Sequence, residues 1–148
     1  MWSFTVVTDP INKYLPDSVP FLTFKGASIQ LVHLANHTSG FPRLPANIFN
    51  GPVDPANPYL HYKPDSLYSF LAHYRPEVEP GTVFSYSNFG TGLLGNILEK
   101  YCQMDFGKMV TAQISTPLGM KHTFVDIPES FRRQFAQGYN ENGIPASP

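Results

Sequence analysis

The clearest helical pattern in the chain lies between residues 88 and 101. Apolar side chains recur there at spacings of three and four residues, which places them on one side of a helix. They are Phe89, Leu93, Leu94, Ile97, Leu98 and Tyr101. Ser87 and Asn88 each carry a side-chain oxygen that can cap the first turn. The sequence therefore predicts a long helix that begins beside these two residues and buries one face.

Three glycines lie inside this predicted helix, at Gly90, Gly92 and Gly95. Each is about 1 kcal/mol less favourable than alanine in a helix interior. Their spacing also matches a dinucleotide-binding fingerprint, but no strand of adequate length precedes it. We therefore expect a backbone or a ligand to come very close to this helix, and a close helix contact relieved by glycine is the favoured interpretation.

Three further helices are predicted from capping residues, apolar spacing and helix breakers. The first is short, and the second opens with a proline at its first turn, where proline is tolerated. The third carries apolar residues after a capping aspartate. They run from Ser28 to near Asn36, from Pro64 to before Pro76, and from Asp105 to Pro117 and Gly119.

Regular hydrogen bonding is limited between the helices. Residues 9–26 and 41–64 contain many prolines, which favours an irregular segment in the first range and a long surface loop in the second. Brief extended pieces are predicted at residues 83–85 and 122–125. The pattern predicts a mainly α fold with long loops and no series of strands that could close a sheet by itself.

Composition limits the size of the fold and excludes several partners. The length of 148 residues fits one compact domain. Of these residues 42% are apolar, near the globular range, and 14% are charged, well below the roughly 25% typical of soluble proteins. A net charge of −1 provides no basic face for nucleic acid. No apolar run approaches the roughly 20 residues that span a bilayer. Cys102 is the only cysteine, so neither an intramolecular disulfide nor a cysteine-based zinc cluster is expected.

Two histidines have the spacing of metal ligands on a helix, His33 and His37. A zinc protease needs glutamate after the first histidine, and Leu34 stands there. His37 also falls where the helix is expected to end. A histidine that stabilises a turn through a backbone hydrogen bond is therefore the favoured interpretation, and no metal is expected.

The tripeptide Tyr86-Ser87-Asn88 is the best candidate for chemistry. It lies where a turn after Pro80-Gly81 meets the N-terminus of the glycine-rich helix, and that helix end favours an anionic oxygen nearby. A tyrosine could move protons there, and the carboxamide of an asparagine offers both a donor and an acceptor to an amide substrate. The alternative is structural: Asn88 caps the helix and Tyr86 packs. A nucleophile elbow is excluded, because Ser85 and Phe89 replace the glycines that it needs.

The stretch from Glu79 to Gly95, EPGTVFSYSNFGTGLLG, resembles the second-motif region of the class C β-lactamases and their penicillin-binding-protein, D-alanyl-D-alanine carboxypeptidase and esterase relatives. Four further segments agree with this family in order: residues 9–16, 33–42, 117–123 and 136–143. The resemblance spans nearly all of the chain but less than half of a family domain. It implies the helical-domain portion of a β-lactamase/transpeptidase-like α+β fold whose sheet is largely absent, so residues 1–148 are expected to form a single partial domain.

The resemblance also implies roles for the site residues. In the family a serine forms an acyl-enzyme with a β-lactam, a D-alanyl peptide or an ester. Tyr86 would be the proton shuttle, and Asn88 would bind the substrate's amide and orient the lysine of the first motif. Ser87 would have no role. No cofactor is implied, and the family location is periplasmic or secreted.

Two family motifs have no match. No serine or threonine precedes a lysine by three positions, and neither Lys-Thr-Gly nor His-Thr-Gly occurs. The resemblance places both missing motifs outside the two ends of this chain. We therefore expect a fragment of a serine hydrolase that has little activity alone and self-associates through an exposed domain interface.

Other interpretations remain open. The chain could be a non-catalytic binding module derived from the same family, because its 14% aromatic content favours interfaces. A third interpretation is a metal-dependent hydrolase whose metal is bound by His33 and His37. Residues 1–5 lack a secretory signal, so we expect either a cytosolic chain or a missing true beginning.

Overall fold

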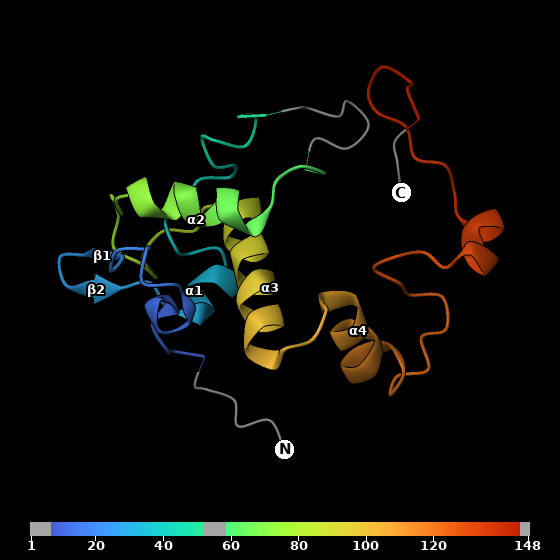
Figure 1. The fold of residues 1–148 in the computed structure, drawn as a ribbon, viewed down its shortest axis with the longest axis horizontal. Helices are drawn as coiled ribbons and strands as arrows, with labels where there is room; N and C mark the ends of the chain where they lie inside the picture. Colours follow the sequence, from blue (N-terminus) through green and yellow to red (C-terminus); the bar gives the residue numbers. More distant parts are fainter. Residues whose placement is uncertain (1–6, 52–58, 146–148) are drawn as a thin grey trace.

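The computed structural model describes residues 7–51 and 59–145. Within these residues the fold is mainly helical, with one two-stranded sheet (Figure 1). The elements in chain order are η1 (Ile11–Tyr14), β1 (Thr23–Phe24), β2 (Ala27–Ser28), α1 (Leu31–Ala35), α2 (Pro64–His73), α3 (Asn88–Cys102), α4 (Phe106–Val110), the π-helical turn η2 (Thr111–Ser115) and η3 (Glu129–Gln134). None of the helices in these two ranges has the length and apolar character needed to cross a membrane.

The hairpin corrects the prediction that Ser28 caps a helix. Ser28 lies in β2 and pairs with Thr23 of β1. Lys25 and Gly26 form the turn with φ of 48° and 86°, which is the positive-φ geometry that tight hairpins prefer. Because Ser28 is held in the sheet, α1 begins later than predicted. Gln30 is its N-cap, in a reciprocal capping box with a side chain of the first turn.

The three later helices begin where the sequence predicts. Pro64 is the first residue of α2, Ser87 is the N-cap of α3, and Asp105 is the N-cap of α4. Residues 122–125 form no strand, so the short strand predicted there is wrong, and the brief extended piece predicted at residues 83–85 does not join a sheet. A strand needs a hydrogen-bonding partner, and the described residues pair only β1 with β2 and two isolated bridges elsewhere.

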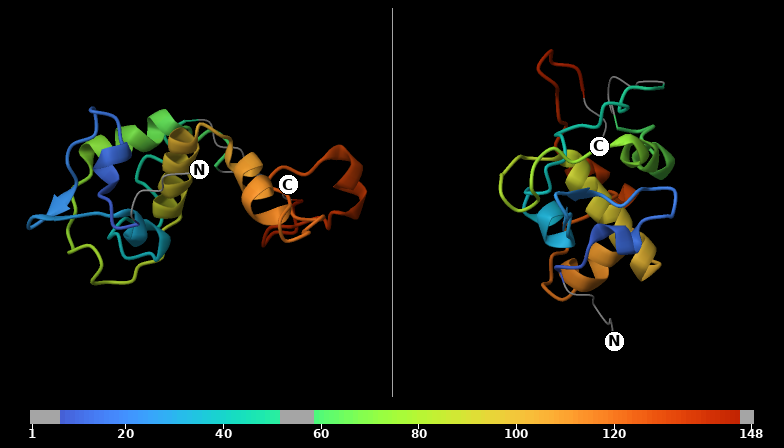
Figure 2. Two further views of the ribbon diagram at one scale, coloured as in Figure 1. Left: turned by 90° about the horizontal axis from the view of Figure 1, so that it is seen from below. Right: turned by 90° about the vertical axis from the view of Figure 1, so that its left-hand side faces the viewer.

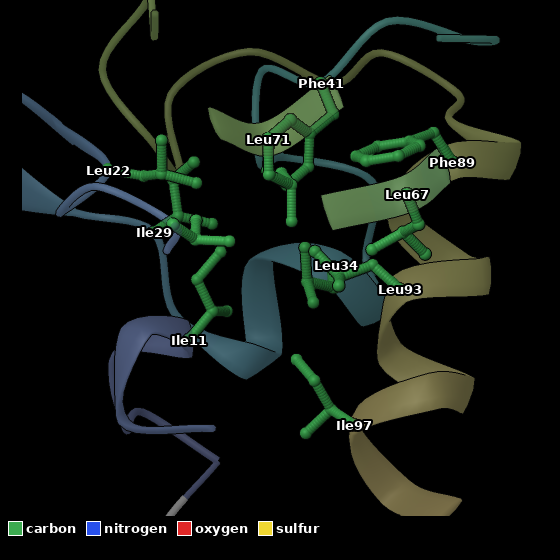
Figure 3. Close-up of a cluster of buried hydrophobic side chains, with 11 residues drawn as sticks. Ile11, Leu22, Ile29, Leu34, Phe41, Leu67, Leu71, Phe89, Leu93 and Ile97 are labelled. Carbon is green, nitrogen blue, oxygen red and sulfur yellow. The ribbon is translucent and has the colours of Figure 1, made fainter. Parts of the chain in front are cut away.

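The hydrophobic core lies between the hairpin, α1, α2 and α3 (Figure 3). Leu34 of α1, Leu71 of α2 and Leu93 of α3 are fully buried in it. Phe89 packs edge-on against Phe41, with 5.1 Å between ring centroids. Burial of each such side chain stabilises the fold by about 1.5–3 kcal/mol. The core therefore fixes the N-terminal half of α3, where the candidate residues lie.

The chain beyond α3 contributes almost nothing to the core. It extends to one side of α3, away from the hairpin and α2 (Figures 1 and 2). Between residues 103 and 145, Ser115 alone is buried. Large apolar side chains remain exposed there, among them Ile114, Leu118, Val125, Phe135 and Ile144. The structure thus shows the exposed apolar surface expected from the sequence, and self-association through it stays a prediction.

Gly40 is predicted to be much less tolerant of alanine than Gly26. Both have positive φ, 77° and 86°, which an L side chain adopts at a cost of about 1–2 kcal/mol. A Cβ on Gly40 would lie 2.7 Å from Cγ2 of Val78, whereas nothing lies within 4 Å of one on Gly26. We expect Gly40→Ala to lower the free energy of unfolding by about 2 kcal/mol, and Gly26→Ala by about 1 kcal/mol. Urea denaturation of both variants measures the difference, and equal losses would contradict it.

Candidate functional site

Ser87 fixes the start of α3. Its Oγ accepts a hydrogen bond from the Gly90 backbone N–H at 2.8 Å and donates one to the Pro42 carbonyl at 2.7 Å. The side chain is 1% exposed. Ser87, and not Asn88, is therefore the N-cap, which settles the alternatives left open by the sequence. In the described part of the chain, no hydrogen bond occupies the Asn88 carboxamide.

Backbone hydrogen bonds join residues 37–43 to residues 81–89, the segment that leads into α3. The backbone carbonyls of Thr38 and His37 accept the N–H groups of Gly81 and Ser85, both at 2.8 Å. The carbonyl of Arg43 then accepts the N–H groups at the first two positions of α3, residues 88 and 89, at 3.1 and 3.3 Å. These bonds fix residues 81–89 against 37–43 and satisfy N–H groups that a helix start leaves without intrahelical partners.

Tyr86 lies beside this start with an exposed ring. Its side chain is 53% exposed, so it is not packed into the core as the structural alternative required. The His37 ring contacts it with 4.6 Å between centroids. The Arg43 guanidinium carbon lies 6.0 Å from the centre of the Tyr86 ring, at the outer range of a cation–π contact. The phenol is thus held by its neighbours and remains open to solvent.

Tyr86 and Asn88 line the same hollow, which has a volume of about 550 Å³. One wall is the face of α3 from Asn88 to Glu99, and the other comes from residues 44–48 and 59–67. Most of the lining is apolar or aromatic, with a few polar groups among it. This composition is typical of pockets that bind small molecules.

The glycines of α3 make room in this hollow. A Cβ on Gly92 would meet nothing within 4 Å, and one on Gly95 would lie 4.0 Å from the ring of Phe106. Gly90 is different, because a Cβ there would approach Oγ of Ser87 to 3.3 Å. Among the three glycines only Gly90 has a close neighbour, and that neighbour is the side chain of the N-cap rather than the backbone or ligand expected from the sequence. Gly92 and Gly95 border open space.

His33 and His37 both have backbone roles. Nδ1 of His33 accepts the Gln30 N–H at 3.2 Å, and Nδ1 of His37 accepts the Ser87 N–H at 3.3 Å. Both rings bond backbone, as the favoured interpretation expected, but only the His33 bond is local, because the His37 bond joins residues 50 positions apart. Both bonds leave the ring proton of a neutral imidazole on Nε2. Within residues 7–51 and 59–145, no group of three or more histidine, cysteine, aspartate or glutamate side chains could hold a metal ion.

His33 should make stability depend on pH. Burial lowers the pKa of its imidazole below the ordinary value of 6.5, so the unfolded chain binds the proton more tightly. The free energy of unfolding is therefore expected to fall as the pH drops below about 6.5 toward the folded-state pKa. Urea midpoints between pH 8 and 5 test this, and the His33→Gln variant should have a flatter profile. An equally steep profile in that variant would assign the effect to other groups.

Ser87→Ala is predicted to lower the free energy of unfolding by about 1–2 kcal/mol, since it removes the N-cap of α3 and the bond to Pro42. Ser85→Ala is the matched control, because Ser85 is exposed and its backbone bond to His37 survives the substitution. Thermal unfolding of the two variants compares them. A similar loss in both would show that the cap is unimportant.

Sequence reasoning missed three parts of this site. It treated His37 only as a metal ligand or turn residue, and it did not single out Arg43 beside Tyr86. It also described residues 41–64 as a loop without assigning them to a wall of the hollow; the prediction for residues 52–58 lies outside the described residues. One signal in the sequence could have indicated His37: residues 33–42 resemble the family. This resemblance does not predict which residues the segment contacts.

Known proteins are similar to this chain in both sequence and fold. A family model described as Beta-lactamase matches residues 6–148. A beta-lactamase of Providencia stuartii is 31% identical over 91% of this chain and 31% of that protein. The D-alanyl-D-alanine-carboxypeptidase/endopeptidase AmpH of Escherichia coli K12 is 31% identical over 86% of this chain and 32% of its own length.

Solved structures agree with these sequence matches. A beta-lactamase/D-alanine carboxypeptidase from Yersinia pestis, complexed with citrate, superposes with a TM-score of 0.73 at 28% identity, over 88% of this chain and 36% of that one. A class C beta lactamase from Rhodobacter sphaeroides gives a TM-score of 0.70 at 28% identity, over 97% of this chain and 36% of its own. The chain spans about a third of the length of the curated relatives it matches. It belongs to the beta-lactamase family.

Proposed function

We propose that the chain is part of a serine hydrolase of the β-lactamase type and supplies Tyr86 and Asn88 to its acyl-transfer site. The observation that carries the proposal is that both side chains line one hollow at the N-terminus of α3. A phenol and a free carboxamide at this point suit proton transfer and amide binding.

The proposed reaction is acyl transfer through a covalent intermediate. A serine hydroxyl attacks the substrate carbonyl and gives its proton to the oxygen of Tyr86 as this phenol passes its own proton on to the leaving nitrogen or oxygen, so Tyr86 ends as the phenol it began as. The Asn88 carboxamide donates to the substrate's carbonyl oxygen or accepts from its amide N–H. Water then releases the acyl group and restores the serine hydroxyl.

The nucleophile decides how active this chain is alone. No serine or threonine in the sequence is followed by lysine three positions later. Loss of a serine nucleophile from a triad enzyme reduces the rate by about 10⁶-fold, whereas general acid–base help supplies about 10²–10⁴-fold. The 148-residue polypeptide is therefore proposed to have little hydrolase activity by itself.

The substrate class follows from the relatives. Those matched here are named as beta-lactamases and as a D-alanyl-D-alanine carboxypeptidase/endopeptidase. The proposed substrate of the whole protein is accordingly a β-lactam, a D-alanyl peptide or a related ester. The apolar walls of the hollow, with Asn88 and Tyr86 at one end of α3, suit an amide or ester with an apolar substituent.

Labelling with a penicillin tests the proposal. The polypeptide is incubated with a labelled penicillin, and intact-mass spectrometry measures any covalent adduct. We expect no adduct on the 148-residue chain. We also expect a stoichiometric adduct on the serine of a Ser-x-x-Lys motif when the surrounding in-frame coding sequence supplies one. A stoichiometric adduct on a serine of the 148-residue chain would overturn the assignment of the nucleophile.

A non-catalytic binding module is the second candidate. The observation that favours it is the apolar hollow in a chain whose sequence has no Ser-x-x-Lys motif. Reading the neighbouring coding DNA discriminates the two candidates. Start and stop signals that enclose only these residues favour the binding module, and an in-frame Ser-x-x-Lys motif upstream favours the hydrolase.

Self-association is proposed for the isolated chain, because apolar side chains such as Leu118 at 70% exposure lie on its surface. Sedimentation velocity over a range of concentrations measures the oligomeric state. A single monomeric species at every concentration contradicts this part of the proposal.

A further inference from the structure

His37 has an unusual backbone conformation directly beside the candidate site. Its φ is 60°, in the left-handed region that few residues other than glycine occupy. Such strain costs about 1–2 kcal/mol and persists where the surrounding structure enforces it. Here the enforcing bond is known: the His37 carbonyl accepts the Ser85 N–H at 2.8 Å.

The imidazole ring contacts the same segment a second time. Its Nδ1 accepts the N–H of Ser87 at 3.3 Å, and the ring lies tilted against Tyr86 with 4.6 Å between centroids. The Phe84 ring meets it edge-on at 5.9 Å. One side chain therefore contacts Phe84, Tyr86 and the backbone of Ser87.

Tyr86 needs such a contact to keep one orientation. Its side chain is 53% exposed, so core packing does not fix its rotamer. Within residues 7–51 and 59–145, its ring contacts are with His37 and Arg43. The Arg43 contact is at 6.0 Å and comes from an exposed, flexible side chain. The closer and better-anchored partner is the imidazole.

We infer that His37 is a positioning residue for Tyr86, which holds the phenol on the wall of the hollow that it shares with Asn88. The inference rests on the proposed function, because it concerns the residue assigned there to proton transfer. His37 itself touches no substrate in this scheme. Its backbone fixes Ser85, its Nδ1 fixes the amide of Ser87, and its ring limits the rotation of the tyrosine between them.

NMR spectroscopy of the 148-residue chain tests the contact without requiring activity. The Tyr86 ring signals are assigned by comparison with Tyr86→Phe. His37→Asn is the informative variant, because asparagine tolerates the left-handed conformation and lacks the ring. His61→Asn is the matched control, since His61 is exposed and does not line the hollow.

In His37→Asn we expect the Tyr86 ring signals to move to the range of the exposed Tyr139, while the melting temperature shows a folded chain. They should stay in place in His61→Asn. In His37→Ala, which also loses the acceptor, the Ser87 amide should exchange about tenfold faster. Unmoved Tyr86 signals in a folded His37→Asn chain would overturn the inference. Should that variant not fold, the absence of a nuclear Overhauser effect between the His37 and Tyr86 rings in the unsubstituted chain would overturn it equally.

A kinetic experiment separates the positioning role from the proposed function. In a protein that contains these residues and acylates with penicillin, His37→Asn should lower kcat by about tenfold to hundredfold and leave KM nearly unchanged. An unchanged kcat contradicts positioning and leaves the hydrolase function intact. Failure of the unsubstituted full-length protein to acylate contradicts the hydrolase function, and the NMR result then decides separately whether His37 orients Tyr86.

Discussion

Replacing Tyr86 with phenylalanine is expected to slow acylation by about 10²–10⁴-fold in a protein that combines these residues with the serine nucleophile. The substitution removes the phenol oxygen and keeps the ring that contacts His37. Proton transfer should therefore be lost while the geometry of the α3 N-terminus is retained. Stopped-flow measurement of acylation by a chromogenic β-lactam gives the rate.

Tyr139→Phe is the matched control for this prediction. Tyr139 is 63% exposed and does not line the hollow, so its loss of a hydroxyl should leave the acylation rate within about twofold. Asn88→Ala should also slow acylation, because it removes the carboxamide that lines the hollow at the first position of α3. A Tyr86→Phe protein that acylates as fast as the parent would remove tyrosine from the mechanism.

Leu93→Ala is expected to lower the free energy of unfolding of the 148-residue chain by about 3–4 kcal/mol. Leu93 is fully buried in the middle of α3, among core side chains from α1 and α2. The substitution leaves a cavity that these helices can close only partly. Because small domains are stable by about 5–15 kcal/mol, much of the fold's stability should be lost. Urea denaturation followed by circular dichroism measures it.

Leu118→Ala makes the same chemical change outside the core. Leu118 is 70% exposed, so its truncation should change the free energy of unfolding by less than about 0.5 kcal/mol. If the two variants lost similar stability, the core would not lie where the structure places it.

Local signals were sufficient to predict the longer helices. The apolar spacing after Asn88, the proline at the start of α2 and the aspartate before α4 each act within one or two turns of the chain. The end of α2 at His73 follows from an equally local feature, the proline at position 76, whereas the left-handed Gln103 that ends α3 after Cys102 has no such signal in the sequence. The starts of α2, α3 and α4 could therefore be predicted without knowledge of tertiary contacts.

The parts that escaped prediction depend on contacts between distant residues. The choice between Ser87 and Asn88 as the cap is made by the Pro42 carbonyl, which lies 45 residues away in sequence. The contact of His37 with Ser87 spans 50 residues. The hairpin has only two residues in each strand, too few for an alternating pattern. The roles of Tyr86 and Asn88 in chemistry stay predictions from the resemblance and the proposed function.

The bond from Ser87 to Pro42 has a consequence for the order of folding. It closes a loop of 45 residues, and the entropy lost on closure must be spent before the bond forms. The later turns of α3 are held by hydrogen bonds between residues close in sequence, so they need no such closure and can form earlier. The first turn of α3 should therefore be completed late in folding, when the two chain segments have met, so the candidate site is assembled among the last features of this domain.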